Sequence, residues 1–334
     1  MKIAVIGAGA IGCLVAGYLK SKGEEISLVG HKSSVKAIKE KGLEISGVKG
    51  DFKIGIEAYE KLNHRPDLII LATKTQDIET ALKENINLIK DTLILTTQNG
   101  IQAETIVAKY ISKDNIISSI VMFGSTYLEP AKVVHNFEGS WIIGRTFNKN
   151  DEIVTEISRI LNKIFPVIVS DNIKGMKYLK MFVNANNCIS AILGVSMQEA
   201  FSDIEISRIS IAIWKEGLKV INKAGINLVS LPDFPLERLT KLTSLSNLEA
   251  AKIFSSIMAN LSKEPLYGSI LQSIKRGRLS EIDYINGEFV RIAEENNINA
   301  FLNKKLVDMV HEVERKNKFF TKEELINNTK ELFN

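Results

Sequence analysis

Short apolar runs alternate with amphipathic segments through the first half of the chain. The apolar runs are the length of buried strands, and residues 11–19 repeat apolar side chains at helical spacing between the first two runs. Such alternation predicts a parallel sheet covered by helices on both faces. The strands predicted in this way are 3–6, 26–29, 67–72, 92–96 and 116–121, and helical patterns at 77–90 and 101–111 separate the later ones.

The pattern changes after Val121. Short apolar runs at 133–134 and 141–143 predict two short strands that meet at a turn near Gly139, as a hairpin added to the sheet. A helix at about 150–165 and a strand at 167–169 then complete this half of the chain.

From about residue 172 the strand signal fades and helical periodicity takes over. The segment LPDFP at 231–235 is interpreted as a connector within this half, and the polar end, 320–334, as prone to fraying. The fold class predicted is α/β, with an N-terminal Rossmann-type doubly wound sheet in residues 1–170 and an all-helical C-terminal domain in 171–334. The predicted helices of the second domain are 174–194, 203–224, 247–260, 283–296 and 302–315.

Composition narrows the class of protein. The chain has 334 residues, 45% of them hydrophobic and 25% charged, with a formal net charge of +4, as in an ordinary globular protein of two domains. The thin charge excess argues against a nucleic-acid surface, and no apolar run is long enough for a membrane span. Two distant cysteines, Cys13 and Cys188, and four scattered histidines indicate neither disulfides nor a metal site. We therefore expect a cytoplasmic, metal-free protein.

A glycine-rich turn joins the first predicted strand to the first predicted helix. Residues Gly7, Ala8, Gly9, Ala10, Ile11 and Gly12 match G-x-G-x-x-G in the context that a dinucleotide site requires. The first glycine allows a tight turn, the second lets a pyrophosphate approach the backbone, and the third lets helix and strand pack closely. A purely structural glycine turn is the alternative.

The end of the second strand bears on the choice of nicotinamide cofactor. NAD sites commonly place a carboxylate there, but this chain has His31, Lys32, Ser33 and Ser34 after Gly30. Lys32 and the hydroxyls suit a 2′-phosphate, with His31 as a stacking or donor group, so NADP (NADPH) is favoured. An ordinary surface lysine at position 32 is the alternative.

Polar side chains follow two further strands of the predicted sheet. Lys74-Thr75-Gln76 comes after the strand at 67–72, and Gln98-Asn99-Gly100 comes after the strand at 92–96. Ligands of open α/β sheets bind at this carboxyl edge. Taken alone, Lys74 also fits a helix cap or the surface, and the second cluster also fits a plain turn.

A lysine and an amide share one face of a largely apolar helix in the second half. Lys180 and Asn184 are four residues apart, with apolar residues between them. This arrangement suggests a pocket wall, and a lysine that extends to solvent is the alternative.

With these motifs in order, the sequence resembles the ketopantoate reductase (2-dehydropantoate 2-reductase) family over nearly its whole length. The resemblance lies in GAGAIG at the start, KTQ from Lys74, QNG from Gln98, YLKMFVNANN around Lys180, and SILQSIKRGRLSEIDYINGEFV from Ser269. It implies a Rossmann domain, a helical domain and an active site in the cleft between them. It also implies reduction of a 2-oxo acid, 2-dehydropantoate, to (R)-pantoate with NADPH on the route to coenzyme A.

The resemblance also implies roles for individual residues. Lys180 is expected to be the general acid that protonates the carbonyl oxygen, and Glu281 a glutamate that hydrogen-bonds in the site. Asn99, Asn184 and Ser269 match residues that position cofactor or substrate, and Lys74 matches a lysine near the nicotinamide. An ammonium stabilises the charge that develops on the carbonyl oxygen and can supply its proton.

One position departs from the family pattern. The family commonly has a second asparagine four residues after the one matched by Asn184, and here that residue is Cys188. A thiol is a poor hydrogen-bond partner, so the substrate differs or Asn187 compensates. Another branched 2-oxo acid or an imino acid therefore stays open, as does a dinucleotide-binding protein without turnover. A homodimer also stays open, because helical second domains often pair.

Overall fold

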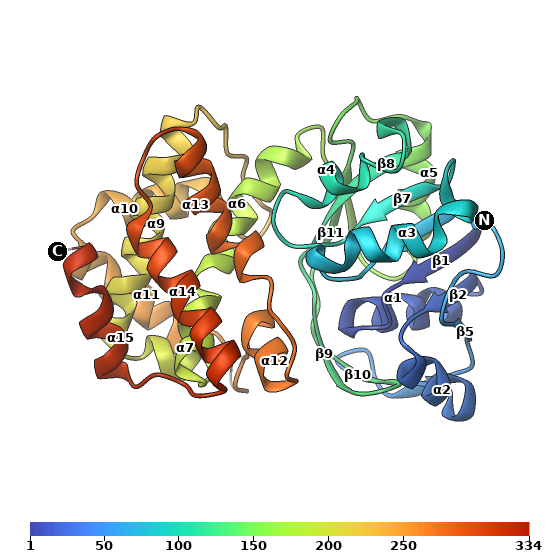
Figure 1. The fold of residues 1–334 in the computed structure, drawn as a ribbon, viewed down its shortest axis with the longest axis horizontal. Helices are drawn as coiled ribbons and strands as arrows, with labels where there is room; N and C mark the ends of the chain where they lie inside the picture. Colours follow the sequence, from blue (N-terminus) through green and yellow to red (C-terminus); the bar gives the residue numbers. More distant parts are fainter. Residues whose placement is uncertain (263, 334) are drawn as a thin grey trace. The chain divides into compact units, whose positions relative to one another are not determined.

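The computed structural model describes residues 1–262 and 264–333 and divides into two compact units (Figure 1). The first unit ends at Lys174 and the second begins at Gly175. This division lies close to the predicted domain boundary at residues 170 and 171. Each unit has its own buried core and is described by itself.

An eight-stranded sheet forms the centre of the first unit. Its strand order is β12-β11-β8-β7-β6-β1-β2-β5, and all neighbours from β8 to β5 run parallel. Only the β8–β11 pair is antiparallel. After β5, which pairs with the outer side of β2, the chain crosses to the other side of β1 at β6, so the strand order reverses beside β1. The strands are β1 Lys2–Ile6, β2 Glu25–Val29, β5 Glu57–Tyr59, β6 Leu68–Leu71, β7 Leu93–Thr96, β8 Ile116–Val121, β11 Trp141–Gly144 and β12 Val167–Val169.

Helices cover both faces of this sheet, as expected for a doubly wound fold. One apolar core joins one face to α1, α2 and α5, and a second joins the other face to α3 and α4. The predicted Rossmann-type architecture is confirmed in this unit. The bounds are α1 Ala10–Ser21, α2 Lys32–Lys41, α3 Ile78–Ile89, α4 Ala103–Val107 and α5 Glu152–Leu161, with 3-10 turns at Thr75–Asp77 and Lys113–Asn115.

A second, smaller sheet corrects the predicted hairpin. Residues 133–134 lie in β10, which pairs with β9 and β3, whereas residues 141–143 lie in β11 of the main sheet. The prediction was wrong because a short apolar pair shows that a strand is present but not which strand it pairs with. The small sheet has the order β4-β3-β10-β9, with β3 Leu43–Gly47, β4 Phe52–Ile54, β9 Gly124–Glu129 and β10 Lys132–Phe137.

Helix α1 packs between the two sheets. A Cβ atom on Gly17 would lie 2.3 Å from Cδ1 of Ile45 in β3, so a larger residue at this crossing would displace the Ile45 side chain. The next residue, Tyr18, places its hydroxyl 2.9 Å from Nδ1 of the buried His135 in β10. Ser125 of β9 donates to the carbonyl of Ala10 at the other end of the helix (3.1 Å). The small sheet therefore fixes α1 along its whole length.

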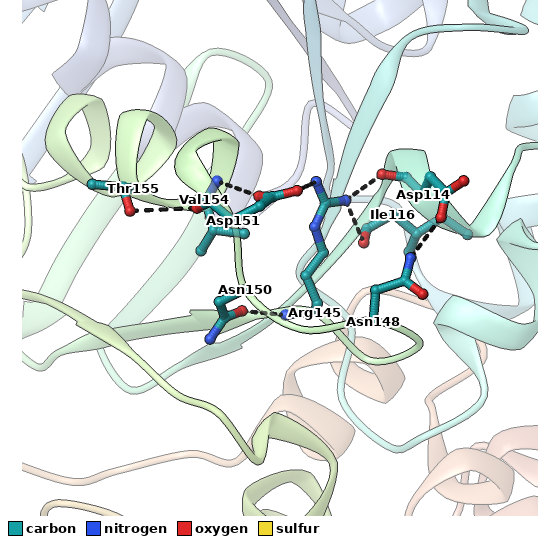
Figure 2. Close-up of polar contacts among 8 residues, drawn as sticks. All are labelled: Asp114, Ile116, Arg145, Asn148, Asn150, Asp151, Val154 and Thr155. Carbon is teal, nitrogen blue, oxygen red and sulfur yellow. Dashed lines mark hydrogen bonds and ion pairs between the residues drawn. The ribbon is translucent and has the colours of Figure 1, made fainter.

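The buried side chain of Arg145 connects several segments at the end of the main sheet where its parallel strands begin (Figure 2). Arg145 follows β11, and its guanidinium donates to the carbonyls of Asp114 and Ile116 and to the carboxylate of Asp151 (2.7 Å). The same carboxylate accepts the N–H of Val154 at the start of α5. The side chain of Arg145 is almost completely buried, so these bonds replace the hydration of its two terminal nitrogens. This polar cluster has a structural role, at the edge opposite the glycine-rich turn.

Within the described residues of the second unit, the regular structure is helical apart from one isolated bridge between Leu231 and Phe234, inside the predicted connector. The predicted helix 174–194 is two helices that meet at Asn186. This unit confirms the predicted all-helical domain. Its helices are α6 Ile173–Ala185, α7 Asn187–Leu193, α8 Met197–Phe201, α9 Ile204–Lys223, α10 Leu236–Ser244, α11 Asn247–Ala259, α12 Ser269–Lys275, α13 Asn286–Glu295, α14 Phe301–Lys316 and α15 Lys322–Thr329, with 3-10 turns at Ile282–Tyr284 and Lys330–Leu332.

The end of the chain corrects a second expectation. Residues 322–329 form α15 instead of fraying, and Leu325 is fully buried. Thr321 and Glu324 cap this helix reciprocally, with each side chain accepting the other residue's backbone N–H. That capping box is visible in the sequence as T-x-x-E, so the signal for an ordered end was present.

Candidate functional site

The glycine-rich turn has the geometry that its sequence predicts. Gly7 adopts φ +117°, and a Cβ atom there would lie 2.5 Å from the backbone of Ala72. A Cβ atom on Gly12 would lie 1.9 Å from the carbonyl oxygen of Gly7, so this glycine permits close packing of helix and loop. A Cβ atom on Gly9 would meet nothing within 4 Å. The turn is therefore closed where it packs and open at Gly9, where a pyrophosphate would approach.

The first turn of α1 also favours the binding of an anion beside the glycine-rich turn. Gly9 is the N-cap residue, and it has no side chain to bind the first N–H groups of Ala10, Ile11 and Gly12. Helix N-termini attract anions because these N–H groups point outward and the helix dipole is positive there. Ala8 lies against Gly30, where a Cβ atom would come within 2.4 Å of the Ala8 side chain. Sequence reasoning did not use Gly30, although a glycine directly after the second strand was a signal for it.

The residues after β2 begin a second helix at the same edge. His31 is the N-cap of α2 in extended conformation, and Lys32 is the first helical residue; both are exposed, as is Ser33. Ser34 differs, because its hydroxyl is buried and hydrogen-bonded to the hydroxyl of Tyr127 (3.0 Å). Of the two hydroxyls considered for a 2′-phosphate, the structure therefore leaves only that of Ser33 exposed.

The two clusters after β6 and β7 are tied together by Gln98. Its amide nitrogen donates to the carbonyls of Leu71 and Thr73, both at 2.8 Å, and its oxygen accepts the N–H of Thr97. Gln98 is buried and holds the two strand ends together. Lys74 directly follows Thr73, and Asn99 directly follows Gln98; both are partly buried. The structure thus brings Lys74, Asn99 and the glycine-rich turn to one edge of the sheet.

In the helical unit, α6 carries the candidate proton donor. Lys180 and Asn184 are partly buried and lie one helical turn apart, among buried neighbours such as Met181 and Phe182. Burial lowers the pKa of Lys180 to about 8, and the charge of Asp233 opposes this shift only in part. A lysine with such a pKa exchanges a proton near neutral pH, as a general acid must.

The remaining candidates of this unit lie on two neighbouring segments. Ser269 is exposed and is the first residue of α12, directly after the buried Gly268. Glu281 is partly buried and precedes the 3-10 turn Ile282–Tyr284, whose residue Tyr284 donates its N–H to the Glu281 carbonyl (3.0 Å).

The departure from the family pattern at Cys188 lies in the interior of the helical unit. Cys188 is fully buried, and burial raises the pKa of its thiol to about 12, so it carries no thiolate. Asn286 hydrogen-bonds to this thiol and donates to Asn303 (3.1 Å), which in turn donates to Glu216. By contrast, Asn187 lies against Gly268, where a Cβ atom would come within 3.0 Å of its side chain. Asn187 is thus beside the start of α12, which bears Ser269.

Metal-binding clusters and membrane-spanning helices are both absent from the described residues. No group of three or more His, Cys, Asp or Glu side chains is placed to hold a metal ion. No helix is both long and apolar enough to cross a membrane.

Comparisons with known proteins cover both units. A family model described as ketopantoate reductase PanE/ApbA matches residues 3–147, and the model of its C-terminal part matches residues 172–314. The 2-dehydropantoate 2-reductase of Pyrococcus horikoshii is 34% identical over 307 residues, which is 91% of this chain and 94% of that protein.

Solved structures give a consistent result. D-mandelate dehydrogenase with NADH and anilino(oxo)acetate is 28% identical, with a TM-score of 0.82 over 95% of this chain and 99% of that chain. A PanE/ApbA family ketopantoate reductase from Ralstonia eutropha, 23% identical, has the same fold, with a TM-score of 0.79 over 95% of this chain and 99% of that chain.

Proposed function

Because the chain belongs to the ketopantoate reductase family, we propose that it reduces 2-dehydropantoate to (R)-pantoate with NADPH. Membership confirms the resemblance found in the sequence, and it makes the protein an oxidoreductase that uses a pyridine nucleotide and a small-molecule substrate. The exact oxo acid, the choice of NADPH and the role of each side chain are the proposal. Placement on the route to coenzyme A, a cytoplasmic location and a homodimer stay predictions.

The first unit fits a dinucleotide. Gly7 and Gly12 leave no room for side chains where the turn packs, while the space beyond Gly9 is open and faces a helix N-terminus. Ala8, Ala10 and Ile11 complete the turn, so the pyrophosphate would contact backbone N–H groups along it. When bound, the nicotinamide supplies the hydride, and the protein supplies position, charge and protons.

Lys180 is the proposed general acid, and its position on α6, one turn from Asn184 and among buried neighbours, is the observation that carries the proposal. Reduction of a ketone builds negative charge on the oxygen, and an ammonium group can stabilise that charge and then give up its proton. Burial brings the pKa of Lys180 to about 8, so the amine is mostly protonated at neutral pH and still transfers its proton readily. A solvent-exposed lysine, with a pKa near 10.4, would be a weaker acid.

The other candidates are proposed to orient the reactants. Asn184 lies one turn from Lys180 and can donate to a substrate oxygen, while Glu281 can accept from a substrate hydroxyl. Asn187 lies beside Gly268, the residue before Ser269, so Asn187 is proposed to replace the family asparagine that is Cys188 here. In the first unit, Asn99 and Lys74 are proposed to contact cofactor or substrate at the carboxyl edge.

Preference for NADPH is proposed to come from the start of α2. Lys32 and Ser33 are exposed there, beside a helix N-terminus, and residues 30–34 include no carboxylate. Substituting Lys32→Ala should therefore weaken NADPH binding by roughly ten- to hundredfold, because a charged hydrogen bond contributes about 1.5–3 kcal/mol. Binding of NADH should stay unchanged, and fluorescence titration of both cofactors measures the difference. Equal losses for the two cofactors would remove Lys32 from the 2′-phosphate site.

A second candidate function is the interconversion of another 2-oxo acid and its 2-hydroxy acid with NADH. Two observations favour it: the likeness to D-mandelate dehydrogenase at 28% identity, and the buried thiol of Cys188 at a position where the family commonly has an amide.

One experiment separates these functions. The purified chain is assayed with 2-dehydropantoate, the oxo acid of mandelate and further branched 2-oxo acids, each with NADPH and with NADH. The proposal expects the highest kcat/KM for 2-dehydropantoate with NADPH. Preference for the aromatic oxo acid with NADH would support the second candidate, and tight cofactor binding without turnover of any oxo acid would contradict both.

A further inference from the structure

We propose that His311, Asp283 and Glu314 form an ionic clamp that positions Glu281 for catalysis and loosens when His311 loses its proton. The inference rests on the proposed role of Glu281 in the reduction. It makes His311 a positioning residue that acts through the segment bearing the carboxylate.

The clamp holds the chain on both sides of Glu281. Immediately before it, the backbone N–H of Ser280 donates to Oε1 of Glu314 at 2.7 Å. Two residues after it, the carboxylate of Asp283 lies 2.9 Å from Nε2 of His311. Because His311 and Glu314 both belong to α14, one helix fixes the position of this short segment.

His311 also joins the two carboxylates to each other. Its Nδ1 atom lies 3.0 Å from Oε2 of Glu314, while Nε2 faces Asp283. Carboxylate oxygens only accept, so both ring nitrogens must donate, and only the imidazolium form has two N–H groups. The geometry therefore defines the protonated state of His311 as the clamped state.

The surrounding charges support this state. Burial lowers the pKa of His311, but its hydrogen bonds and charge interactions with Asp283 and Glu314 outweigh burial and raise the pKa above its usual value. On α13, which packs against α14, Glu288 and Arg291 pair with each other at 2.8 Å. Helix α7, on another side, has Cys188 as its one titratable residue, buried and neutral. Helix α9 directs Glu216 to the N–H groups of Leu302 and Asn303 at the far end of α14.

Loss of the proton should loosen the segment. A neutral imidazole can donate to only one of the two carboxylates, so the other bond is lost and the hold on residues 280–283 weakens. The rate with a 2-oxo acid should therefore fall as pH rises through the pKa of His311, in addition to the separate fall when Lys180 deprotonates. A catalytic group that moves out of line loses rate steeply, so a partial loss of about five- to tenfold is expected.

The first test is structural and independent of activity. Proton NMR of the full-length protein follows the imidazole signals of its four histidines, with His311→Gln identifying the signal of interest. The pKa of His311 should lie above the usual value of a histidine, and Asp283→Asn should lower it. Hydrogen exchange of residues 280–284, compared at one pH, should be faster in His311→Gln than in wild type. An unshifted pKa or unchanged exchange would overturn the clamp.

The second test is kinetic. At a pH below the pKa of His311, His311→Gln should lower kcat about five- to tenfold, and the difference should shrink as the pH rises. His64→Gln, in the other unit, is the matched control and should follow wild type at every pH. In the Glu281→Gln background, adding His311→Gln should have no further effect, because the two act through one group. A pH-independent loss, or full additivity, would contradict positioning. Inactivity of wild type with every oxo acid would instead refute the proposed function, leaving the NMR result to judge the clamp.

Discussion

The two units hold their candidate site groups in different ways. In the α/β unit the backbone dominates at the glycine-rich turn, where Gly7, Gly12 and Gly30 allow close approach. In the helical unit, side chains dominate: Lys180 owes its lowered pKa to burial, and Glu281 lies in a segment held by His311. Backbone geometry is encoded within a few adjacent residues, whereas side-chain contacts join distant parts of the chain. The first kind of site can be predicted locally, and the second requires the fold.

The largest expected effect on activity comes from a substitution in the helical unit, where side chains form the candidate site. Lys180→Ala should lower kcat by about 10²–10⁴-fold, the range typical for loss of a general acid, while cofactor binding should change little. Steady-state kinetics together with NADPH titration measures both. Lys174→Ala, an exposed lysine of the same helix, is the control and should behave as wild type. An unaltered kcat in Lys180→Ala would end its proposed role.

Substitutions of two glycines test how the backbone forms the proposed cofactor site in the α/β unit. Gly12→Ala should destabilise the protein by about 1–3 kcal/mol, because the new methyl group would collide with the carbonyl of Gly7. Gly9→Ala should leave stability unchanged, since a Cβ atom there meets nothing, yet weaken NADPH binding by about tenfold or more, a loss of about 1.4 kcal/mol. Thermal unfolding and cofactor titration of the two variants test this. If Gly9→Ala binds NADPH normally, the pyrophosphate does not approach the turn there.

The smallest expected effect is an opposite pH dependence of stability in the two units. Burial, with a contribution from Lys49, lowers the pKa of His135, so the folded α/β unit favours the neutral ring. Its stability should fall as the pH drops below about 6.5, where the unfolded chain gains the proton more readily. His311 has a raised pKa, so its contribution is present below about 6.5 and is lost as the pH rises through the folded pKa.

Denaturant unfolding of His135→Phe and His311→Gln as a function of pH measures these contributions. His135→Phe should reduce the loss of stability in acid, and His311→Gln should reduce the loss as the pH rises. Identical pH profiles for wild type and both variants would contradict the assignment.

Much of the fold could be predicted because hydrophobic periodicity and composition within a short segment indicate whether that segment forms a helix or a strand. The strands at 67–72 and 167–169 and the helices at 203–224 and 302–315 match the observed elements to within about two residues. The small sheet was not predicted, since β4 has only three residues and β3 and β9 have partly polar sequences. The pairing of β10 with β3 joins segments about ninety residues apart, and no local pattern encodes it.

Prediction of the candidate site was limited in the same way, because contacts between residues far apart in the sequence leave no local pattern. The glycine-rich turn, Lys74 and Asn99 could be placed at one sheet edge because each follows a parallel strand. The clamp could not be predicted: His311 lies 28 residues from Asp283, and nothing in the sequence around either residue marks the other as its partner. Likewise, the burial of Ser34 against Tyr127 depends on β9, which was not predicted.

The position of α1 between two sheets has a practical consequence for protein engineering. This helix is 12 residues, or about 18 Å, long; its first turn faces the proposed phosphate site, and its far half is locked through Gly17 and Tyr18 to β3 and β10. Transplanting the nucleotide-binding segment into another scaffold would thus require carrying the accessory strands along. A minimal graft ending at β2 would leave the helix without its outer support and free to tilt.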